Sequence, residues 1–183
     1  WLSAAGLRNL RGLRLLKLKL IRCPLLTDSD AAVLVDLHLP LLALDVSHTF
    51  TGEALATLSR MRSLRELAVS GVSRSSQASW LKFLDLITVR FYKCMMPGDA
   101  LQCITMMGNL QHLDLFQCPN VTDESVALAL FAAVPETRRS LRRLMLSDCD
   151  LVTGLNFPDL AAFPNLSVVN LSRCRNLRLL SFL

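Results

Sequence analysis

The feature that most constrains the fold is a short motif that recurs along most of the chain. In its two most complete copies, which begin at Leu15 and Leu110, Leu-x-x-Leu-x-Leu-x-x-Cys is followed after three residues by Thr-Asp. Seven copies can be aligned; they begin at residues 15, 41, 64, 86, 110, 141 and 166, so their spacings are 22 to 31 residues. A unit of this size is too small to bury its own apolar face and must stack on its neighbours. We therefore predict that residues 1–183 form one solenoid segment of about seven repeats.

The apolar positions of each copy alternate with variable residues, which is the pattern of a strand with one buried face. Identical strands that are 22 to 31 residues apart cannot form hairpins, so they must pair in parallel through crossover segments. Thr27, Thr51 and Thr122 precede apolar residues at helical spacing and are suitable N-cap residues. We expect helices in these three crossovers.

The remaining crossovers differ in their expected structure. We expect helices after Ser76 and after Asp99. Between Pro158 and Pro164 we expect an irregular segment or only a turn or two of helix. The longest crossover carries an additional segment at residues 135–139. Insertions in solenoids usually form loops on one face, so this segment is predicted to be a surface loop.

Neither end of the sequence looks like a terminal repeat of a solenoid. The sequence begins at Trp1 rather than Met, and Leu179, Leu180 and Phe182 are apolar residues near its last position. Terminal repeats of solenoids normally present a polar outer face. We therefore expect the chain to be part of a longer protein, with further repeats or another subunit against both ends.

Five of the six cysteines occupy the last position of the motif, and these are Cys23, Cys94, Cys118, Cys149 and Cys174. Thr49 and Val72 replace the cysteine in the second and third copies. A uniform column gives no reason for any one pair to form a disulfide, so we expect buried, reduced thiols that act as a structural ladder. This expectation points to an intracellular reducing compartment, which could be the cytoplasm, the nucleus or an organelle matrix.

The motif closely resembles the cysteine-containing subclass of leucine-rich repeats, and the resemblance covers Leu13 to about Leu177. It implies an α/β horseshoe with a parallel sheet on the concave face and helices or irregular crossovers on the convex face. It also implies a role in binding other proteins. The best-known members of this subclass are substrate receptors of F-box ubiquitin ligases, but no segment here resembles an F-box.

The residues between the leucines should form columns on the sheet face opposite the core. Tyr92 and Phe116 are neighbours in a column that is otherwise rich in serine. Clustered aromatic residues on an exposed surface are typical of interface hot spots. The alternative is an aromatic pair that packs on itself and has no partner. The predicted protein-binding residues are Arg90, Tyr92, Lys93, His112, Asp114, Phe116, Arg143 and Met145.

Charged residues of neighbouring copies should also meet on this face. The alignment places Arg90 beside Asp114 and Lys19 beside Asp45, so we expect these charges to neutralise one another. Exposed pairs of this kind contribute only about 0 to 1 kcal/mol to stability.

The densest positive region consists of Arg138, Arg139, Arg142 and Arg143. Such a cluster could contact an acidic protein segment or nucleic acid. The neighbouring residues do not include the interleaved aromatic side chains that stack on bases, which argues against nucleic acid. The formal net charge of +5 is a weak bias towards acidic partners, because the basic residues are distributed along the chain.

Sequence features of an enzyme are missing. His38, His48 and His112 fall in different copies, and no histidine, cysteine and carboxylate spacing suggests a metal site. There is no glycine-rich phosphate loop, and Cys103 has no evident base nearby in the sequence. The longest apolar run, residues 126–135, is too short to cross a bilayer. We therefore expect no catalytic activity, no cofactor, no metal site and no membrane insertion.

The sequence favours a non-catalytic scaffold or accessory subunit that binds other protein subunits of an intracellular assembly. A substrate receptor of an F-box-type ubiquitin ligase is the alternative. A subunit associated with RNA is the third possibility, and strongly salt-dependent binding through the arginine cluster would distinguish it.

Overall fold

The computed structural model describes residues 2–72, 84–95, 100–155 and 159–178. Within these residues the protein is an α/β structure with one seven-stranded sheet. The strands are β1 (Lys17–Lys19), β2 (Ala43–Asp45), β3 (Glu66–Ser70), β4 (Thr88–Tyr92), β5 (His112–Phe116), β6 (Arg143–Met145) and β7 (Val168–Asn170). All neighbouring strands are parallel and their spatial order is their sequence order, which confirms the predicted parallel pairing.

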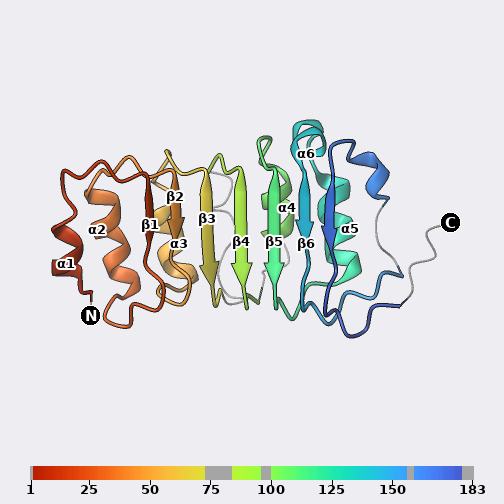
Figure 1. Ribbon diagram of the computed structural model, residues 1–183, viewed down its shortest axis with the longest axis horizontal. Coiled ribbons are helices and arrows are strands. Elements are labelled where there is room, and N and C mark those ends of the chain that lie inside the picture. The colour runs from red at the N-terminus through yellow and green to blue at the C-terminus, as the bar shows by residue number, and fades with distance from the viewer. Residues whose placement is uncertain (1, 73–83, 96–99, 156–158, 179–183) are drawn as a thin grey trace.

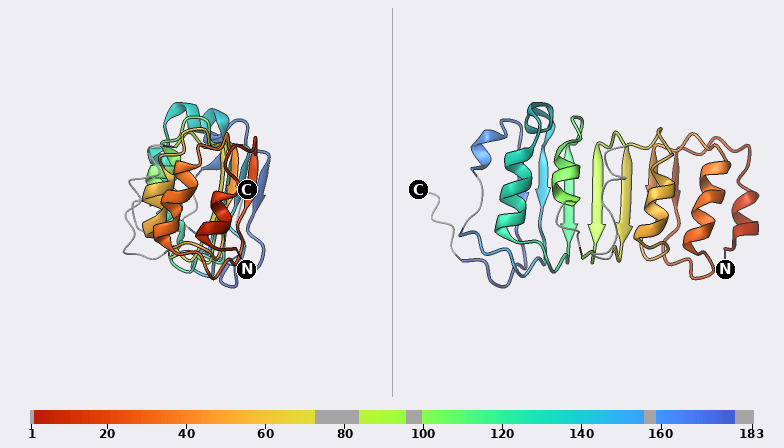
Figure 2. Two further views of the ribbon diagram at one scale, coloured as in Figure 1. Left: turned by 90° about the vertical axis from the view of Figure 1, so that its left-hand side faces the viewer. Right: turned by 180° about the vertical axis from the view of Figure 1, so that it is seen from behind.

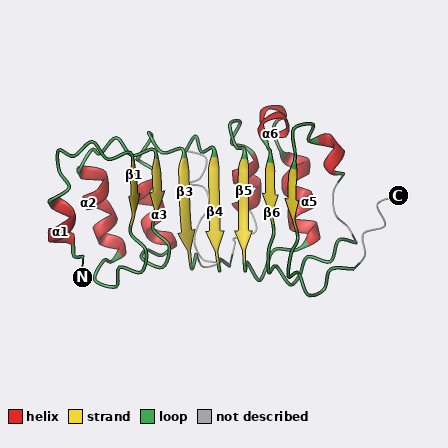
Figure 3. Cartoon of the chain, viewed as in Figure 1, coloured by secondary structure: helices red, strands yellow, loops and turns green. Residues whose placement is uncertain are grey.

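The described helices cover one face of the sheet and leave the other uncovered (Figure 1). The α-helices are α1 (Ala4–Arg8), α2 (Ala31–Asp36), α3 (Gly52–Leu58), α4 (Ala100–Thr105), α5 (Asp123–Ala132) and α6 (Pro135–Ser140). Two 3-10 helices, η1 (Asp28–Asp30) and η3 (Leu160–Ala162), also lie in crossovers. The end-on and rear views show the helices and the strands as separate layers (Figure 2), and the strands form a single row (Figure 3). We call the sheet face that points away from the helices the open face.

The core lies between the sheet and the helices. The central leucine or valine of each inner strand points into it and is at most 3% exposed, as seen at Leu44, Leu67, Val89, Leu113 and Leu144. The equivalent residue of the last strand, Val169, is 41% exposed because β7 is an edge strand. Burial of each such side chain stabilises the fold by about 1.5 to 3 kcal/mol.

A left-handed residue ends every strand segment. The residue immediately before the cysteine position has a positive φ in all seven units, namely Arg22, His48, Gly71, Lys93, Gln117, Asp148 and Arg173. Only one of the seven is glycine, although the left-handed conformation costs other residues about 1 to 2 kcal/mol. Hydrogen bonds to the next unit offset this cost, for example from the Lys93 amide to the Phe116 carbonyl at 2.8 Å. The turn directs the following side chain, usually a cysteine, into the core.

The inward-pointing thiols connect successive units by hydrogen bonds. The Cys149 thiol lies 3.3 Å from the Leu115 carbonyl, and the Cys174 thiol lies 2.9 Å from the Leu146 carbonyl. Each acceptor is the third apolar residue of the preceding motif copy. Thr49 makes the equivalent bond through its hydroxyl, which donates to the Leu20 carbonyl. The second unit has therefore lost the cysteine but has kept its hydrogen bond.

The predicted helix starts at Thr27, Thr51 and Thr122 are confirmed. The Thr51 hydroxyl accepts from the Glu53 amide at 3.4 Å, and Thr122 forms a capping box with Ser125. Thr27 caps the 3-10 turn η1, which leads directly into α2. The helix predicted after Asp99 is α4, whereas the helix predicted after Ser76 lies outside the described residues. Within its described residues, the last crossover contains the short η3, in agreement with the expectation of an irregular segment or a turn or two of helix.

Aspartates at two of these helix starts bind the next unit. The Asp123 carboxylate accepts from the Thr153 amide at 2.9 Å, from the Thr153 hydroxyl at 2.7 Å and from the Gly154 amide at 3.1 Å. Asp28 accepts from the amide of Thr51 at 2.7 Å and also from its hydroxyl. The Thr-Asp pair of the motif thus both starts a crossover and connects it to its neighbour.

The prediction of a surface loop at residues 135–139 is wrong, because this insertion forms the short helix α6. Pro135 occupies the start of the helix, where a missing amide donor costs least. Thr137 is completely buried and donates to the Met107 carbonyl at 3.0 Å, which fixes α6 against the preceding unit. None of the helices in the described ranges has the length and apolarity needed to cross a membrane.

Candidate functional site

The open face consists of three side-chain columns whose predicted register is confirmed. Strand pairing aligns the first column as Lys17, Ala43, Glu66, Thr88, His112, Arg143 and Val168. It aligns the second as Lys19, Asp45, Ala68, Arg90, Asp114, Met145 and Asn170. The third contains Ser70, Tyr92 and Phe116 within the longer strands β3 to β5. Because strand residues alternate between the two faces, a correct register assigns every side chain to its face.

Tyr92 and Phe116 contact each other at the centre of this face, as the alignment predicts. Their ring centroids are 6.3 Å apart and their planes meet at 66°, which is an edge-to-face arrangement. Such pairs contribute about 0.5 to 1.5 kcal/mol beyond the area they bury. Both rings remain half-buried, so part of each is accessible to a partner. Burial, followed by the charge of Asp114, raises the pKa of Tyr92 and keeps its hydroxyl protonated at neutral pH.

The ion pair of Arg90 differs from the one predicted. Arg90 is aligned with Asp114, but its guanidinium lies 3.6 Å from the Glu66 carboxylate on the other side, one strand away and diagonal to it. Burial raises the pKa of Asp114, and the nearby charge of Arg90 opposes this shift. Lys19 and Asp45 are aligned as predicted, but no ion pair joins these two described residues.

His112 contributes a second type of ring to the open face. Its Nδ1 lies 3.2 Å from the Thr88 hydroxyl on the neighbouring strand. Burial lowers the pKa of His112, and the positive charges of Arg143 and Arg90 lower it further. The imidazole is therefore neutral at pH 7, and the centre of the face presents three rings without a net charge on any of them.

The other predicted site residues border this aromatic centre. Lys93 is exposed in the left-handed turn after β4, Arg143 is exposed on β6, and Met145 is half-buried on β6. All eight predicted residues therefore lie on β4 to β6 or in the adjoining turn.

The four predicted arginines lie in different structural settings. The Arg138 guanidinium donates to the Ala133 carbonyl at 3.1 Å and to the Phe131 carbonyl at 2.8 Å, so it caps the end of α5. Arg139 is exposed on α6, whereas Arg143 belongs to the first column of the open face. Arg142 is exposed just before β6. Because Arg138 is occupied, fewer positive groups are available for phosphates than the sequence suggests.

A depression on the open face near β1 includes residues that we did not predict from the sequence. Its lining contains the short side chains of Ala43 and Ala68 and the longer ones of Lys17, Arg90 and Tyr92. The aligned columns could have indicated this depression. They place small residues, Ala43 on β2 and Ala68 on β3, between the longer residues of β1 and β4.

Four of the five ladder cysteines are buried in the folded protein as predicted, whereas Cys23 is partly exposed. Cys94, Cys118 and Cys149 are completely buried, and Cys174 is 7% exposed. Burial raises the pKa of the Cys94 and Cys149 thiols to about 11, and it raises the pKa of Cys118 further. A thiol must ionise to act as a nucleophile or metal ligand, so these groups are structural. All six cysteines are free, and no group of metal-ligating side chains is found in the described part of the chain.

No protein-family model matches the sequence, and no curated protein is significantly similar to it.

Proposed function

We propose that this chain is a cysteine-containing leucine-rich-repeat solenoid that binds other proteins through its open face, as a non-catalytic scaffold or accessory subunit. Support for the repeat family comes from features that recur unit by unit. They are the parallel strands in sequence order, the left-handed residue before each cysteine position and the thiol or hydroxyl bond to the preceding unit. In this proposal the open face is the concave side of the solenoid.

The observation that carries the binding role is the edge-to-face pair of Tyr92 and Phe116 on a face that none of the described helices covers. Interface hot spots are enriched in aromatic residues and arginine, and they are surrounded by polar residues. The pair has this environment, because Arg90 and Asp114 occupy the neighbouring column of the same two strands. His112 adds a neutral ring beside them.

A reducing compartment is part of the same proposal. It is supported by the six free cysteines and by thiols that already donate hydrogen bonds within the core. Disulfides are rare in the cytosol and nucleus, where thiols are kept reduced.

The proposal is tested by purifying the full-length protein with its bound partners from its native source. The Tyr92→Ala/Phe116→Ala variant should lose the partners, because both rings of the hot spot are removed. Leu128→Ala/Phe131→Ala is the matched control, since these two residues are 54% and 79% exposed on α5 in the helical layer. Circular dichroism must first show that both variants are folded. Partners retained by the Tyr92→Ala/Phe116→Ala variant, or lost equally in the control, would contradict the proposal.

A further inference from the structure

The depression near β1 lies directly beside the aromatic pair. Ala43 and Ala68 leave space between the long side chains of Lys17 and Lys19 on one side and Tyr92 on the other. Ala68 is only 4% exposed, so it lies low among its neighbours. Tyr92 belongs both to the depression and to the contact with Phe116. One continuous surface therefore leads from the β1 lysines to the aromatic pair.

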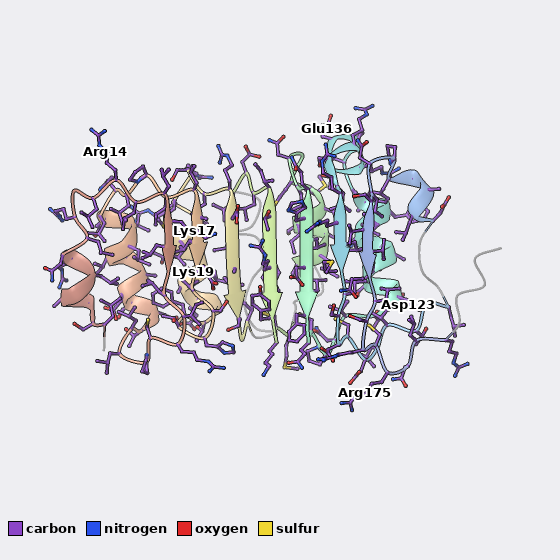
Figure 4. All side chains as sticks on the ribbon, viewed as in Figure 1. Arg14, Lys17, Lys19, Asp123, Glu136 and Arg175 are labelled. Carbon is purple, nitrogen blue, oxygen red and sulfur yellow. The ribbon has the colours of Figure 1, made fainter. Side chains whose placement is uncertain are left out.

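The charges along this surface are unequally compensated. Glu66 is neutralised by Arg90 at 3.6 Å. Asp45 accepts a hydrogen bond from the Ser47 amide at 3.1 Å and keeps its negative charge, but it faces two lysines in the lining, Lys17 and Lys19. Lys17 and Lys19 are exposed, and within the described ranges neither takes part in an ion pair. Figure 4 labels both lysines at the β1 end of the open face.

The sequence around these lysines strengthens the positive charge. Residues 8–22 contain six basic residues and no acidic residue. Clustered charges of one sign attract partners of the opposite sign and raise their association rate. The β1 end of the open face is therefore suited to acidic side chains.

We propose that the partner contributes an extended segment with acidic residues at Lys17 and Lys19 and an apolar or aromatic residue at Tyr92 and Phe116. This refinement rests on the protein-binding role proposed above. Lys19 and the aromatic pair are three to four strands apart and displaced by two residues along the strands. With parallel strands about 4.8 Å apart, this separation is roughly 16 to 20 Å, which an extended chain spans in about five or six residues.

Defined peptides test the spacing and the charge. Fluorescein-labelled peptides carry an Asp-Asp pair about two, about five or about nine residues before a phenylalanine. Only the intermediate spacing matches the span given above. A second set carries Lys-Lys instead. Fluorescence anisotropy at low salt measures their binding to the wild-type protein and to the Lys17→Glu/Lys19→Glu variant. Arg60→Glu is the control for a charge reversal away from the open face, because Arg60 is exposed in the turn after α3 and outside the three columns.

The wild-type protein should bind the Asp-Asp peptide of intermediate spacing most tightly, on the order of tenfold better than its Lys-Lys counterpart. Lys17→Glu/Lys19→Glu should reverse this preference, and Arg60→Glu should leave it unchanged. Equal binding of the two peptide sets, a preference that survives the double charge reversal, or no measurable binding of any peptide would overturn the refinement.

The native partner separates this refinement from the general role. If Tyr92→Ala/Phe116→Ala abolishes partner binding and Lys17→Glu/Lys19→Glu leaves it unchanged, the acidic segment is wrong and the protein-binding role remains. If neither variant changes partner binding, both proposals are wrong.

Discussion

The hydroxyl of Thr49 donates a hydrogen bond to the carbonyl of Leu20, the position that receives a cysteine thiol in later units. The same hydroxyl accepts from the Cys23 amide at 3.1 Å. Thr49 therefore satisfies one donor and one acceptor of the preceding unit. A motif position that has changed its residue type has kept its hydrogen-bonding function.

Substitution at Thr49 should distinguish this bond from simple packing. Thr49→Val keeps the shape of the side chain but leaves the Leu20 carbonyl and the Cys23 amide without this partner, so it should lower the free energy of unfolding by about 1 to 3 kcal/mol. Thr49→Cys restores a weaker donor and should cost less than about 1 kcal/mol. Urea unfolding monitored by circular dichroism measures both. Equal stability of the two variants would show that the bond contributes nothing.

The carboxylate of Asp123 should be important for the contact between successive crossovers. Asp123→Ala removes the acceptor of the Thr153 and Gly154 amides and should destabilise the protein by about 2 to 4 kcal/mol. The neighbouring Glu124 is exposed on the same helix, so Glu124→Gln is the matched control and should change stability by less than about 0.5 kcal/mol. Unfolding midpoints in urea provide the comparison. A loss of the same size in both variants would point to helix electrostatics instead.

His112 should make the stability depend on pH. Because burial lowers the pKa of His112 in the folded state, the unfolded chain binds more protons once the pH falls below about 6.5. The contribution of His112 is fully present above its unfolded pKa and is lost as the pH falls through the folded pKa. His112→Gln should therefore lose less stability than the wild type between about pH 7.5 and pH 5.

The source of this pKa shift can be measured separately. An NMR titration of the His112 ring should give a pKa below the usual histidine value of about 6.5. Arg143→Gln removes a charge that disfavours the imidazolium, so the pKa should rise in that variant. A wild-type pKa at or above 6.5 would contradict the described environment.

Thiol labelling should separate the cysteines by burial. In the native protein Cys23 and Cys103 are partly exposed and should react with a maleimide, whereas Cys94, Cys118 and Cys149 should react only after unfolding. Mass spectrometry of peptides after timed labelling identifies each site. Rapid modification of Cys118 under native conditions would show that the ladder opens.

Side chains on regular strands were the most predictable part of the candidate site. The alternation of apolar and variable residues assigned Tyr92, Arg90 and His112 to one face, and the constant motif length gave their neighbours on the next strand. The contact between Tyr92 and Phe116 followed from this register alone.

Interactions that depend on side-chain conformation were less predictable. Alignment placed Arg90 beside Asp114, but a long flexible guanidinium can reach a diagonal neighbour and pairs with Glu66. Arg138 belonged to an apparent basic cluster, yet the carbonyls at the end of α5 lie within its reach. The helix α6 was not predicted because insertions in solenoids were expected to form loops, although Pro135 is a residue type that favours the first turn of a helix.

The most direct test of the central claim is the dissociation constant for the native partner, measured in solution for the wild type, the Tyr92→Ala/Phe116→Ala variant and the Leu128→Ala/Phe131→Ala control. Removal of both rings of the hot spot should cost more than about 2 kcal/mol of binding free energy. This loss should raise the dissociation constant at least about thirtyfold. The control should bind like the wild type. A folded Tyr92→Ala/Phe116→Ala variant with unchanged affinity would mean that the two rings only pack on each other and that the open face is not where the partner binds.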